Sequence, residues 1–435
     1  MKKHVLFVGI LLFCLCIKTL VIAQNNKSYP IADGTFIQNE LIANWNDDRW
    51  QLELKALKDV GMHYIIIAPT LHTEKGINES MYPSTLSDVK QKYKSDLVDN
   101  CLRNAAKAGF KVFLGLNLNE EWWDGKFTYE WLNHQMELGN NVADELTKRY
   151  KAKYGDVMYG WYWVWEVDNA HCSTPLLQDA LASILNVNLD HLHAITPSMP
   201  FMLCPFMNYR LGTADENRRM WERVFAGAHF NKGDIFAPQD CIGAGGLKLD
   251  TLDVWFREMK KAVDTKSGLL FWSDAETFDQ RFWTIAPLNR FINQMEIVKP
   301  YVSNIISFAY SHYYSPYKVN KKYHEAYLEY VRTGALPKMS SIGTHIDLQW
   351  NKDIENKVLL TWKIPADSSE IAGYYIFRNG ELIANIQNEK KRRNTPRNAF
   401  LEKKPLEKGT YQYEVCAYSF TGATSEKEGV KCEIN

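Results

Sequence analysis

The chain has 435 residues, with 51 lysines and arginines against 51 aspartates and glutamates, so its formal net charge at pH 7 is zero. Because no field of one sign surrounds such a chain, nucleic acid and anionic membrane surfaces are excluded as expected partners. The 14 tryptophans and 23 tyrosines suit a protein that handles sugars, since aromatic rings pack on the apolar faces of sugar rings. The same composition also suits a large core.

The first segment, residues 1–23, is predicted to be a cleavable signal peptide. Lys2 and Lys3 give it a positive start, residues 5–17 form an apolar stretch, and the small residue Ala23 stands at the expected cleavage site. We therefore expect a periplasmic or extracellular protein.

Two alternatives to a cleaved signal peptide are weighed. An uncleaved membrane anchor is disfavoured because the apolar stretch is too short to span a bilayer comfortably. A lipoprotein attached at Cys14 is disfavoured because the bulky Phe13 stands where a small residue is expected. No later segment is long and apolar enough to span a membrane, so we expect no membrane span in the mature chain.

Between residues 31 and 332, short apolar runs alternate with stretches of helical periodicity. The runs predict eight strands, at residues 34–38, 63–69, 111–117, 158–166, 200–205, 234–238, 269–273 and 302–309. The stretches between and after them predict eight helices, at residues 49–60, 97–108, 130–150, 176–193, 216–230, 251–263, 288–298 and 323–332. Such alternation predicts parallel strands with right-handed crossovers, and eight units predict a (β/α)8 TIM barrel. We place this catalytic domain at residues 24–338.

An open, doubly wound sheet is the alternative fold. It normally carries a glycine-rich phosphate-binding turn after its first strand, and residues 36–39 read Phe-Ile-Gln-Asn. The glycine-rich stretch at residues 242–246 comes late in the chain, and we interpret it as a flexible loop.

The pattern changes after residues 340–346, which we interpret as a linker. Short alternating runs follow at residues 358–363, 373–378, 381–386, 411–418 and 430–434, and Asn379-Gly380 is typical of a tight hairpin turn. Residues 339–435 are therefore predicted to form a small all-β sandwich of the immunoglobulin type.

The last quarter of the chain resembles a fibronectin type III domain. The resemblance lies in Leu360-Thr361-Trp362, in the hairpin over residues 373–380, and in residues 411–418 followed by Gly422. It implies a spacer, support or binding module and no particular activity.

Six cysteines remain after the signal peptide, and their spacing forms no zinc pattern. Cys416 and Cys432 either pair across a hairpin centred near Thr424 or remain buried thiols, which we slightly favour. The H-x-H of metal-dependent hydrolase barrels is absent from the first strand. We therefore expect no metal and no other cofactor.

The carboxyl ends of the strands are where the active site of such a barrel lies. Glu166 follows the fourth predicted strand and Glu276 follows the seventh. The residues predicted to bind sugar hydroxyls are Gln38, Asn119, Glu120, Asn208, Asp240 and His312, and those predicted to stack on sugar rings are Trp122, Trp123 and Tyr313. At least three of the five tryptophans Trp122, Trp123, Trp161, Trp163 and Trp165 are expected to be packing residues of the barrel and its helices.

This placement of two glutamates resembles the retaining glycoside hydrolases on (β/α)8 barrels known as clan A. The resemblance implies that Glu166 is the general acid/base and that Glu276 is the nucleophile. Retention requires the two carboxyls about 5–5.5 Å apart, whereas a gap of about 6.5–9.5 Å indicates inversion. Arg210 or a tyrosine would keep the nucleophile ionised.

Some residues depart from the clan A pattern. Clan A members commonly have Asn before the strand-four glutamate, and Trp165 stands there, so Asp168 or Glu121 are alternatives for the acid. Asp274 is the alternative for the nucleophile.

The barrel region also resembles an uncharacterised bacterial family of secreted, glycoside-hydrolase-like barrels. The shared features are the motifs at residues 34–38, 48–50 and 274–278. We therefore expect a secreted or periplasmic glycoside hydrolase with a carbohydrate substrate. The alternative is a non-catalytic glycan-binding protein, in which the two glutamates would be ion-paired and out of reach of each other. The sequence carries no signal for the oligomeric state.

Overall fold

The computed structural model describes residues 28–125, 128–338, 342, 346–365, 368–388 and 398–434. The predicted signal peptide lies outside the described residues, as does most of the predicted linker. Within these described ranges, no helix is both long enough and apolar enough to cross a membrane.

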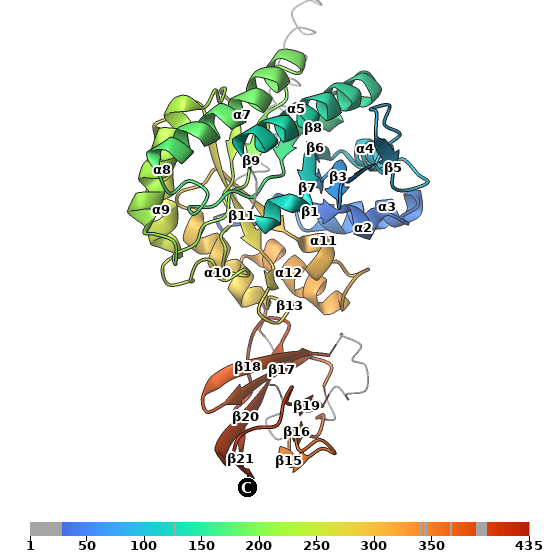
Figure 1. The fold of residues 1–435 in the computed structure, drawn as a ribbon. Coiled ribbons are helices and arrows are strands. Elements are labelled where there is room, and N and C mark those ends of the chain that lie inside the picture. The colour runs from blue at the N-terminus through green and yellow to red at the C-terminus, as the bar shows by residue number, and fades with distance from the viewer. Residues whose placement is uncertain are drawn as a thin grey trace, which may run out of the picture.

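Eight parallel strands close into a barrel in the order β1-β14-β11-β10-β9-β8-β6-β2 (Figure 1). The strands are β1 (Gly34–Gln38), β2 (Tyr64–Ala68), β6 (Lys111–Gly115), β8 (Met158–Trp163), β9 (Phe201–Leu203), β10 (Ile235–Phe236), β11 (Leu270–Glu276) and β14 (Asn304–Phe308). The predicted TIM barrel is confirmed, and the open sheet is excluded because β1 pairs with both β2 and β14.

The predicted helices are also present and surround the barrel (Figure 1). They are α3 (Asp47–Asp59), α4 (Leu97–Ala108), α5 (Tyr129–Leu146), α7 (Pro175–Ile195), α8 (Ala214–Gly227), α9 (Leu252–Asp264), α10 (Leu288–Val298) and α12 (Lys321–Thr333). Short helical segments join them: α2 (Asn39–Ile42), η1 (Glu120–Asp124), η2 (Thr147–Lys151), α6 (Ala152–Tyr154), η3 (Gly155–Val157) and α11 (Tyr310–Tyr313).

Capping side chains set where several of these helices begin. Asn46, Asp96 and Thr174 each accept a hydrogen bond from the backbone N–H three residues on, which satisfies a donor that the first turn leaves free. Thr213 and Glu216 form a reciprocal capping box at the start of α8.

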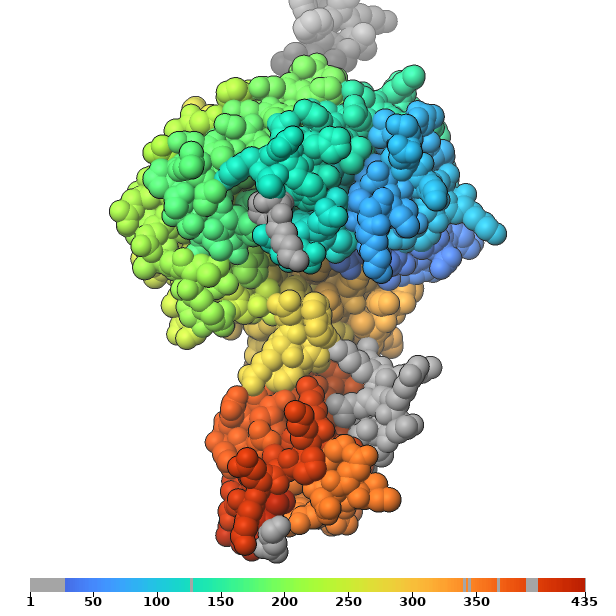
Figure 2. All heavy atoms as spheres, in the orientation of Figure 1, coloured from blue at the N-terminus to red at the C-terminus, as the bar shows by residue number. Residues whose placement is uncertain are grey.

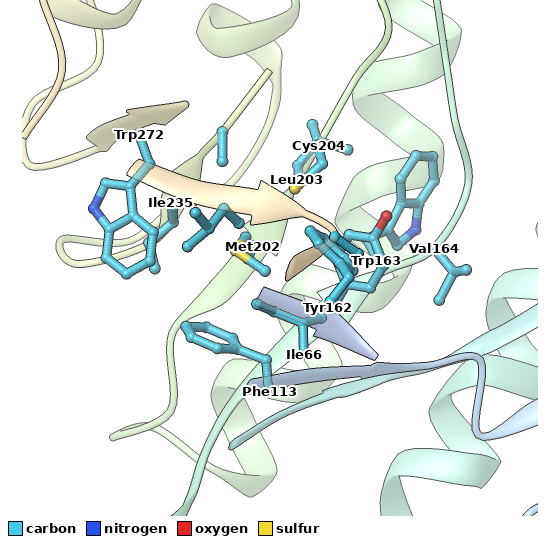
Figure 3. Close-up of a cluster of buried hydrophobic side chains, with 14 of the residues drawn as sticks. Ile66, Phe113, Tyr162, Trp163, Val164, Met202, Leu203, Cys204, Ile235 and Trp272 are labelled. Carbon is cyan, nitrogen blue, oxygen red and sulfur yellow. The ribbon is translucent and has the colours of Figure 1, made fainter. Parts of the chain in front are cut away.

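The lower part of the barrel is closed by apolar and aromatic side chains. Figure 3 shows Phe113, Tyr162 and Trp272 gathered with aliphatic residues among the strands. The ring of Tyr64 lies 5.4 Å from that of Trp272. Gly160 makes room for this layer, since a Cβ there would lie 2.4 Å from the Phe113 ring. The barrel is therefore a packed core up to the level of its mouth.

The tryptophans of β8 and the segment after it pack on residues around the barrel. The indole of Trp161 donates to Thr196, and that of Trp163 donates to Asn188 of α7. Trp165 contacts the edge of Trp131 on α5. Because side chains alternate along a strand, this leaves Tyr162 facing the interior of the barrel.

Two small sheets were not predicted. One has the order β5-β4-β3-β7 and contains β3 (Leu71–Glu74), β4 (Ile77–Ser80), β5 (Val89–Gln91) and β7 (Asn117–Asn119). The other is a hairpin of β12 (Phe278–Asp279) and β13 (Thr284–Ile285), directly after β11.

The C-terminal part consists of two antiparallel sheets and has its own hydrophobic core, as predicted for an all-β sandwich. One sheet contains β15 (Gln349–Lys352), β16 (Val358–Thr361) and β19 (Ala399–Leu401). The other contains β17 (Ile371–Arg378), β18 (Glu381–Gln387), β20 (Gly409–Ser419) and β21 (Glu428–Ile434).

Cys416 and Cys432 are both buried free thiols. In the β20–β21 pair, Cys432 lies opposite Tyr411, and Val415 lies opposite Glu428. The hairpin is therefore centred before Thr424, and its register places the two cysteines on different rungs. The disulfide that the sequence left open is not formed.

The β12–β13 hairpin contacts the C-terminal sheets. The side chain of Asn385 donates to Thr284 Oγ1 at 3.0 Å. The N–H of Ile285 donates to Gln387 Oε1 at 3.1 Å, and its carbonyl accepts from Gln387 Nε2 at 3.2 Å. In Figure 2 this yellow segment lies directly against the orange and red C-terminal part.

A second contact joins the start of α10 to the turn after β20. The N–H groups of Leu288 and Asn289 donate to the carbonyls of Phe420 and Thr421, both at 3.1 Å. The ring of Phe420 packs edge-on against Tyr323 of α12, 4.8 Å away. The barrel's hydrophobic core therefore continues into the C-terminal sheets.

Candidate active site

Glu276 and Glu166 lie at the mouth of the barrel, at or just after the ends of β11 and β8. These strands are three steps apart in the ring of eight, through β10 and β9. The charge of Glu166 is one of the causes that raise the pKa of Glu276, so the two carboxyls are near enough to interact electrostatically. The structure thus brings the two predicted catalytic residues together.

Glu276 is almost completely buried and firmly held. Its Oε2 accepts a hydrogen bond from the N–H of Ala244 at 2.7 Å. Its carbonyl accepts from Arg290 at 3.1 Å and from Gln294 at 3.0 Å, both on α10. The Asp240 carboxylate accepts its N–H at 3.3 Å. Side chain and backbone are therefore fixed independently.

Asp240 supports Glu276 from a fully buried position. Besides the N–H of Glu276, its carboxylate accepts from the Gln294 side chain and from the N–H of Ile242 at 3.1 Å. These contacts give Asp240 a positioning role, although the sequence suggested that it binds sugar hydroxyls.

Burial is the main cause of the unusual electrostatics at this site. It raises the pKa of Glu276 to about 8, helped by the charge of Asp240 and opposed by the Ala244 N–H and the Arg290 charge. It raises the pKa of Glu166 to about 7, opposed by a hydrogen bond with Gln239. Near neutral pH the two carboxyls are therefore partly protonated, whereas exposed glutamates would be fully ionised.

Glu166 is held more loosely than Glu276. It is only half-buried, and its side chain has the hydrogen bond with Gln239. Its carbonyl accepts from the indole of Trp122 at 3.2 Å, and the Trp122 ring is stacked on His171 at 4.7 Å. Trp122 therefore positions the Glu166 backbone from a buried site, and its ring is not open to a stacking ligand.

The alternative acids fit the role of proton donor less well than Glu166. Asp168 accepts from His171 Nδ1 at 2.7 Å and from two backbone N–H groups, and these bonds outweigh its burial and lower its pKa. Glu121 is exposed and accepts from the Trp131 indole at 3.2 Å.

The alternative nucleophile, Asp274, is buried two residues before Glu276 on β11. Burial raises its pKa well above the usual range, and its Oδ1 has no hydrogen-bond partner among the described residues. Glu276 differs from Asp274 in that its Oε2 accepts the Ala244 N–H, which favours the ionised form that a nucleophile needs. Arg210, expected near the nucleophile, donates instead to the Gly245 carbonyl at 2.8 Å, and Arg290 is the cation that acts on Glu276.

Three predicted sugar-binding residues lie on β1 and after β14. His312 is buried enough that its pKa falls to about 4, so its ring is neutral, and its Nε2 accepts from the Gln38 backbone N–H at 3.2 Å. The Gln38 side chain is exposed. The Tyr313 ring is stacked on Phe278 at 5.7 Å, and the Glu276 charge contributes to its raised pKa. Tyr313 therefore lies beside the nucleophile candidate.

The other predicted residues have local partners. Asn119 accepts from Glu121 N–H and caps η1, while Glu120 pairs with His72 at 2.6 Å. Asn208 accepts from the Arg210 N–H at 3.0 Å.

Trp123 is 53% exposed on η1.

The glycine-rich loop at residues 242–246 is tied down, contrary to the expectation of a flexible loop. Gly243 packs so closely that a Cβ would lie 2.2 Å from the Phe278 carbonyl and 3.0 Å from Glu276 Oε2. The Gly243 carbonyl accepts from Gln280 N–H at 2.8 Å, and Gly246 accepts from Tyr209 N–H at 2.9 Å. The glycine content of the loop does not reveal that its Ala244 N–H donates to Glu276.

Two further observations concern the surroundings of the site. A cavity of about 460 Å³ lies to the side of the mouth, lined in part by Gln178, Arg219 and Arg223, and neither Glu166 nor Glu276 lines it. In the part of the chain that the structure describes, no group of three or more His, Cys, Asp or Glu side chains is arranged to hold a metal ion.

Solved structures similar to this chain were found, and one of them supports the fold. A solved structure from Bacteroides thetaiotaomicron VPI-5482, titled a "putative alpha-L-fucosidase", matches with a TM-score of 0.57 and 23% identity, over 70% of this chain and 97% of that one. The endo-beta-1,4-mannanase from Thermotoga petrophila matches with a TM-score of 0.44 and 11% identity, over 94% and 99%. At these identities the first match shows a shared barrel fold.

No curated protein sequence matches the chain. Residues 32–320 match the family described as "Domain of unknown function (DUF4434)", which spans the whole ring of barrel strands. The chain belongs to this family.

Proposed function

We propose that this DUF4434 protein is a retaining glycoside hydrolase that acts outside the cytoplasm, with Glu276 as nucleophile and Glu166 as general acid/base. The observation that carries the proposal is the pair of carboxyls with raised pKa values, one at the end of β11 and one after β8, which interact across a single barrel mouth. Retaining hydrolysis needs two such groups, one protonated and one ionised.

The first chemical step uses both glutamates. A Glu276 oxygen attacks the anomeric carbon while the bond from that carbon to the glycosidic oxygen breaks, and the departing oxygen takes the proton of Glu166. The sugar is then bound to Glu276 as an ester. In the second step a water attacks the anomeric carbon, Glu166 takes its proton, and Glu276 leaves as a carboxylate.

Two groups around Glu276 favour the ionised form that a nucleophile needs. They are the Ala244 N–H and the charge of Arg290, although burial and the charge of Asp240 outweigh them and raise the pKa of Glu276 to about 8. The positive charge that develops on the sugar ring in the transition state favours the anion further. The looser setting of Glu166 suits a group that must exchange a proton with substrate and water.

Glycan binding without cleavage is the competing function, and it predicts ion-paired glutamates that do not interact. Across the described residues, no ion pair within 4.0 Å involves Glu166 or Glu276. The charge of Glu166 contributes to the raised pKa of Glu276, so the two carboxyls do interact. These observations favour the hydrolase.

Trapping of the sugar ester tests the proposal. A screen of 4-nitrophenyl glycosides and polysaccharides identifies a cleaved sugar, and the matching 2-deoxy-2-fluoro glycoside is then incubated with the intact chain. We expect one added sugar on the tryptic peptide of residues 267–281, which contains Glu276. The Glu276→Gln variant is the control and should remain unlabelled.

A label on any other peptide, or turnover with inversion at the anomeric carbon, would sink the proposal. So would the absence of any cleaved glycoside in the screen.

A further inference from the structure

We infer that Trp283, at the tip of the β12–β13 hairpin, is a binding platform for a sugar ring that lies outside the position of bond cleavage. The inference rests on the proposed function, because it assigns an additional part of the same glycan-binding site. Nothing in the sequence pattern pointed to this residue, which sits between two strands of two residues each.

Trp283 is a large apolar side chain left open to solvent. It is 59% exposed with the C-terminal sheets in place, so it is not part of the contact between barrel and sandwich. Its backbone has φ of 50°, in the left-handed region that is costly for a residue with a bulky side chain. Strain of this kind is characteristic of positions retained for function.

One face of Trp283 is already stacked, which leaves the other for a ligand. The Phe278 ring lies 6.1 Å away and is nearly parallel, with an angle of 11° between planes. A sugar ring offers a flat face of C–H groups of similar size to an aromatic ring. Stacking on a tryptophan already held flat by a neighbour costs little side-chain entropy.

The stack leads inward to the catalytic carboxyl. Phe278 is itself stacked on Tyr313 at 5.7 Å and 25°, and Tyr313 lies close enough to Glu276 for that charge to raise its pKa. Trp283 is therefore two stacking steps out from Tyr313. A ring on Trp283 cannot be the ring that Glu276 attacks, so it belongs to another unit of an oligosaccharide.

The C-terminal sheets hold the platform in place. On one side of Trp283, Arg281 donates to the Leu382 carbonyl and pairs with Glu381 at 3.3 Å. On the other side, Thr284 and Ile285 are hydrogen-bonded to β18 as described above. The hairpin is thus fixed on both sides of its exposed tip, and the sandwich contributes to substrate binding by positioning Trp283.

The test compares two substrates of one sugar: the 4-nitrophenyl monoglycoside and the oligosaccharide that the screen identifies. Trp283→Gly removes the ring at a backbone conformation that glycine adopts freely, so the fold should be retained, and its melting temperature checks this. We expect kcat/KM on the oligosaccharide to fall by about tenfold or more, mainly through KM, with less than about a twofold change on the monoglycoside. Trp283→Phe should recover most of the loss.

The control is Ile354→Ala, which changes an exposed apolar residue in the turn between β15 and β16 and should alter neither substrate. An equal effect of Trp283→Gly on both substrates, or none on the oligosaccharide, would overturn the inference.

A glycan array separates this inference from the proposed function. It is probed with the intact chain and with Trp283→Gly if no glycoside is cleaved. Binding that is lost in Trp283→Gly would keep the platform while the hydrolase proposal fails. Binding that is unchanged, or no binding by the intact chain, would overturn the platform as well.

Discussion

Glu276 and Glu166 lie at one barrel mouth and interact electrostatically, and their surroundings differ. On the β11 side, the Ala244 N–H, Asp240, Arg290 and Gln294 hold the side chain and backbone of Glu276 from three directions. On the β8 side, Glu166 is half-buried, with Gln239 as side-chain partner. The difference matches the two proposed tasks, since attack at carbon demands accurate placement and proton transfer tolerates movement.

Removing each carboxylate in turn should have the greatest effect on activity and should distinguish the roles of Glu276 and Glu166. Glu276→Gln replaces the carboxylate that forms the sugar ester with a neutral, weakly nucleophilic amide, and we expect kcat on a 4-nitrophenyl glycoside to fall at least ~10⁴-fold. Glu166→Gln should cost about 10²-fold on the same substrate, because 4-nitrophenolate leaves with little need of an acid. Steady-state kinetics checks both values, and equal losses would contradict the assignment of roles.

The tight packing on the β11 side gives the next largest effect. Gly243→Ala forces a Cβ against the Phe278 carbonyl and Glu276 Oε2, so the loop must shift and the Ala244 N–H moves with it. We expect kcat/KM to fall by about 10²-fold. Gly409→Ala is the matched control, because its nearest neighbour would lie 3.7 Å away, in ordinary contact. A fully active Gly243→Ala would show that the loop does not position Glu276.

The pH dependence of the reaction should report the pKa values of the two glutamates. The working pair has one proton, so kcat/KM should be bell-shaped with its maximum between the pKa values of about 7 and about 8. Asp240→Asn removes a negative charge that raises the pKa of Glu276, the higher of the two values, and the basic limb should then move to lower pH by about one unit. An unchanged basic limb would exclude Asp240 as the residue that tunes Glu276.

The pH dependence of the free energy of unfolding should also distinguish Glu276 from Glu166. Both folded-state pKa values exceed the ordinary 4.5, so the folded chain binds more protons than the unfolded one between these values. The free energy of unfolding therefore falls as pH rises, by ~1.4 kcal/mol per pH unit for each group. In denaturant titrations, the advantage of Glu166→Gln over the native chain should stop growing near pH 7, and that of Glu276→Gln near pH 8. Advantages that level off together would contradict the different settings.

The barrel could be predicted because its elements are long and periodic. The expected helices at residues 97–108 and 288–298 coincide with α4 and α10, and Asn379-Gly380 does form the β17–β18 turn, with positive φ at both residues. The strands of the small β5-β4-β3-β7 sheet could not be predicted, since segments such as Asn117–Asn119 are short and polar. They exist because neighbouring strands supply partners that the local sequence does not reveal.

The site was predicted only in part, for a similar reason. The position of a strand end indicated Glu166 and Glu276, because the carboxyl ends of parallel strands meet at one mouth. Arg290 and Gln294 lie on α10 and read as ordinary helix residues, and only the fold brings them to the Glu276 carbonyl. Asp240 follows its strand and lies beside Glu276, but its contacts depend on partners far away in the chain.

The backbone bonds from Leu288 and Asn289 to Phe420 and Thr421 bear on how this protein can be shortened. A barrel produced without its last hundred residues would expose Tyr323 and leave two N–H groups at the start of α10 without their acceptors. Gly422 permits the close approach, since a Cβ there would lie 2.1 Å from the Asn289 side chain. A cut at the linker would therefore expose apolar surface on the barrel, and we expect the barrel to be more stable and soluble when it is expressed together with the sandwich.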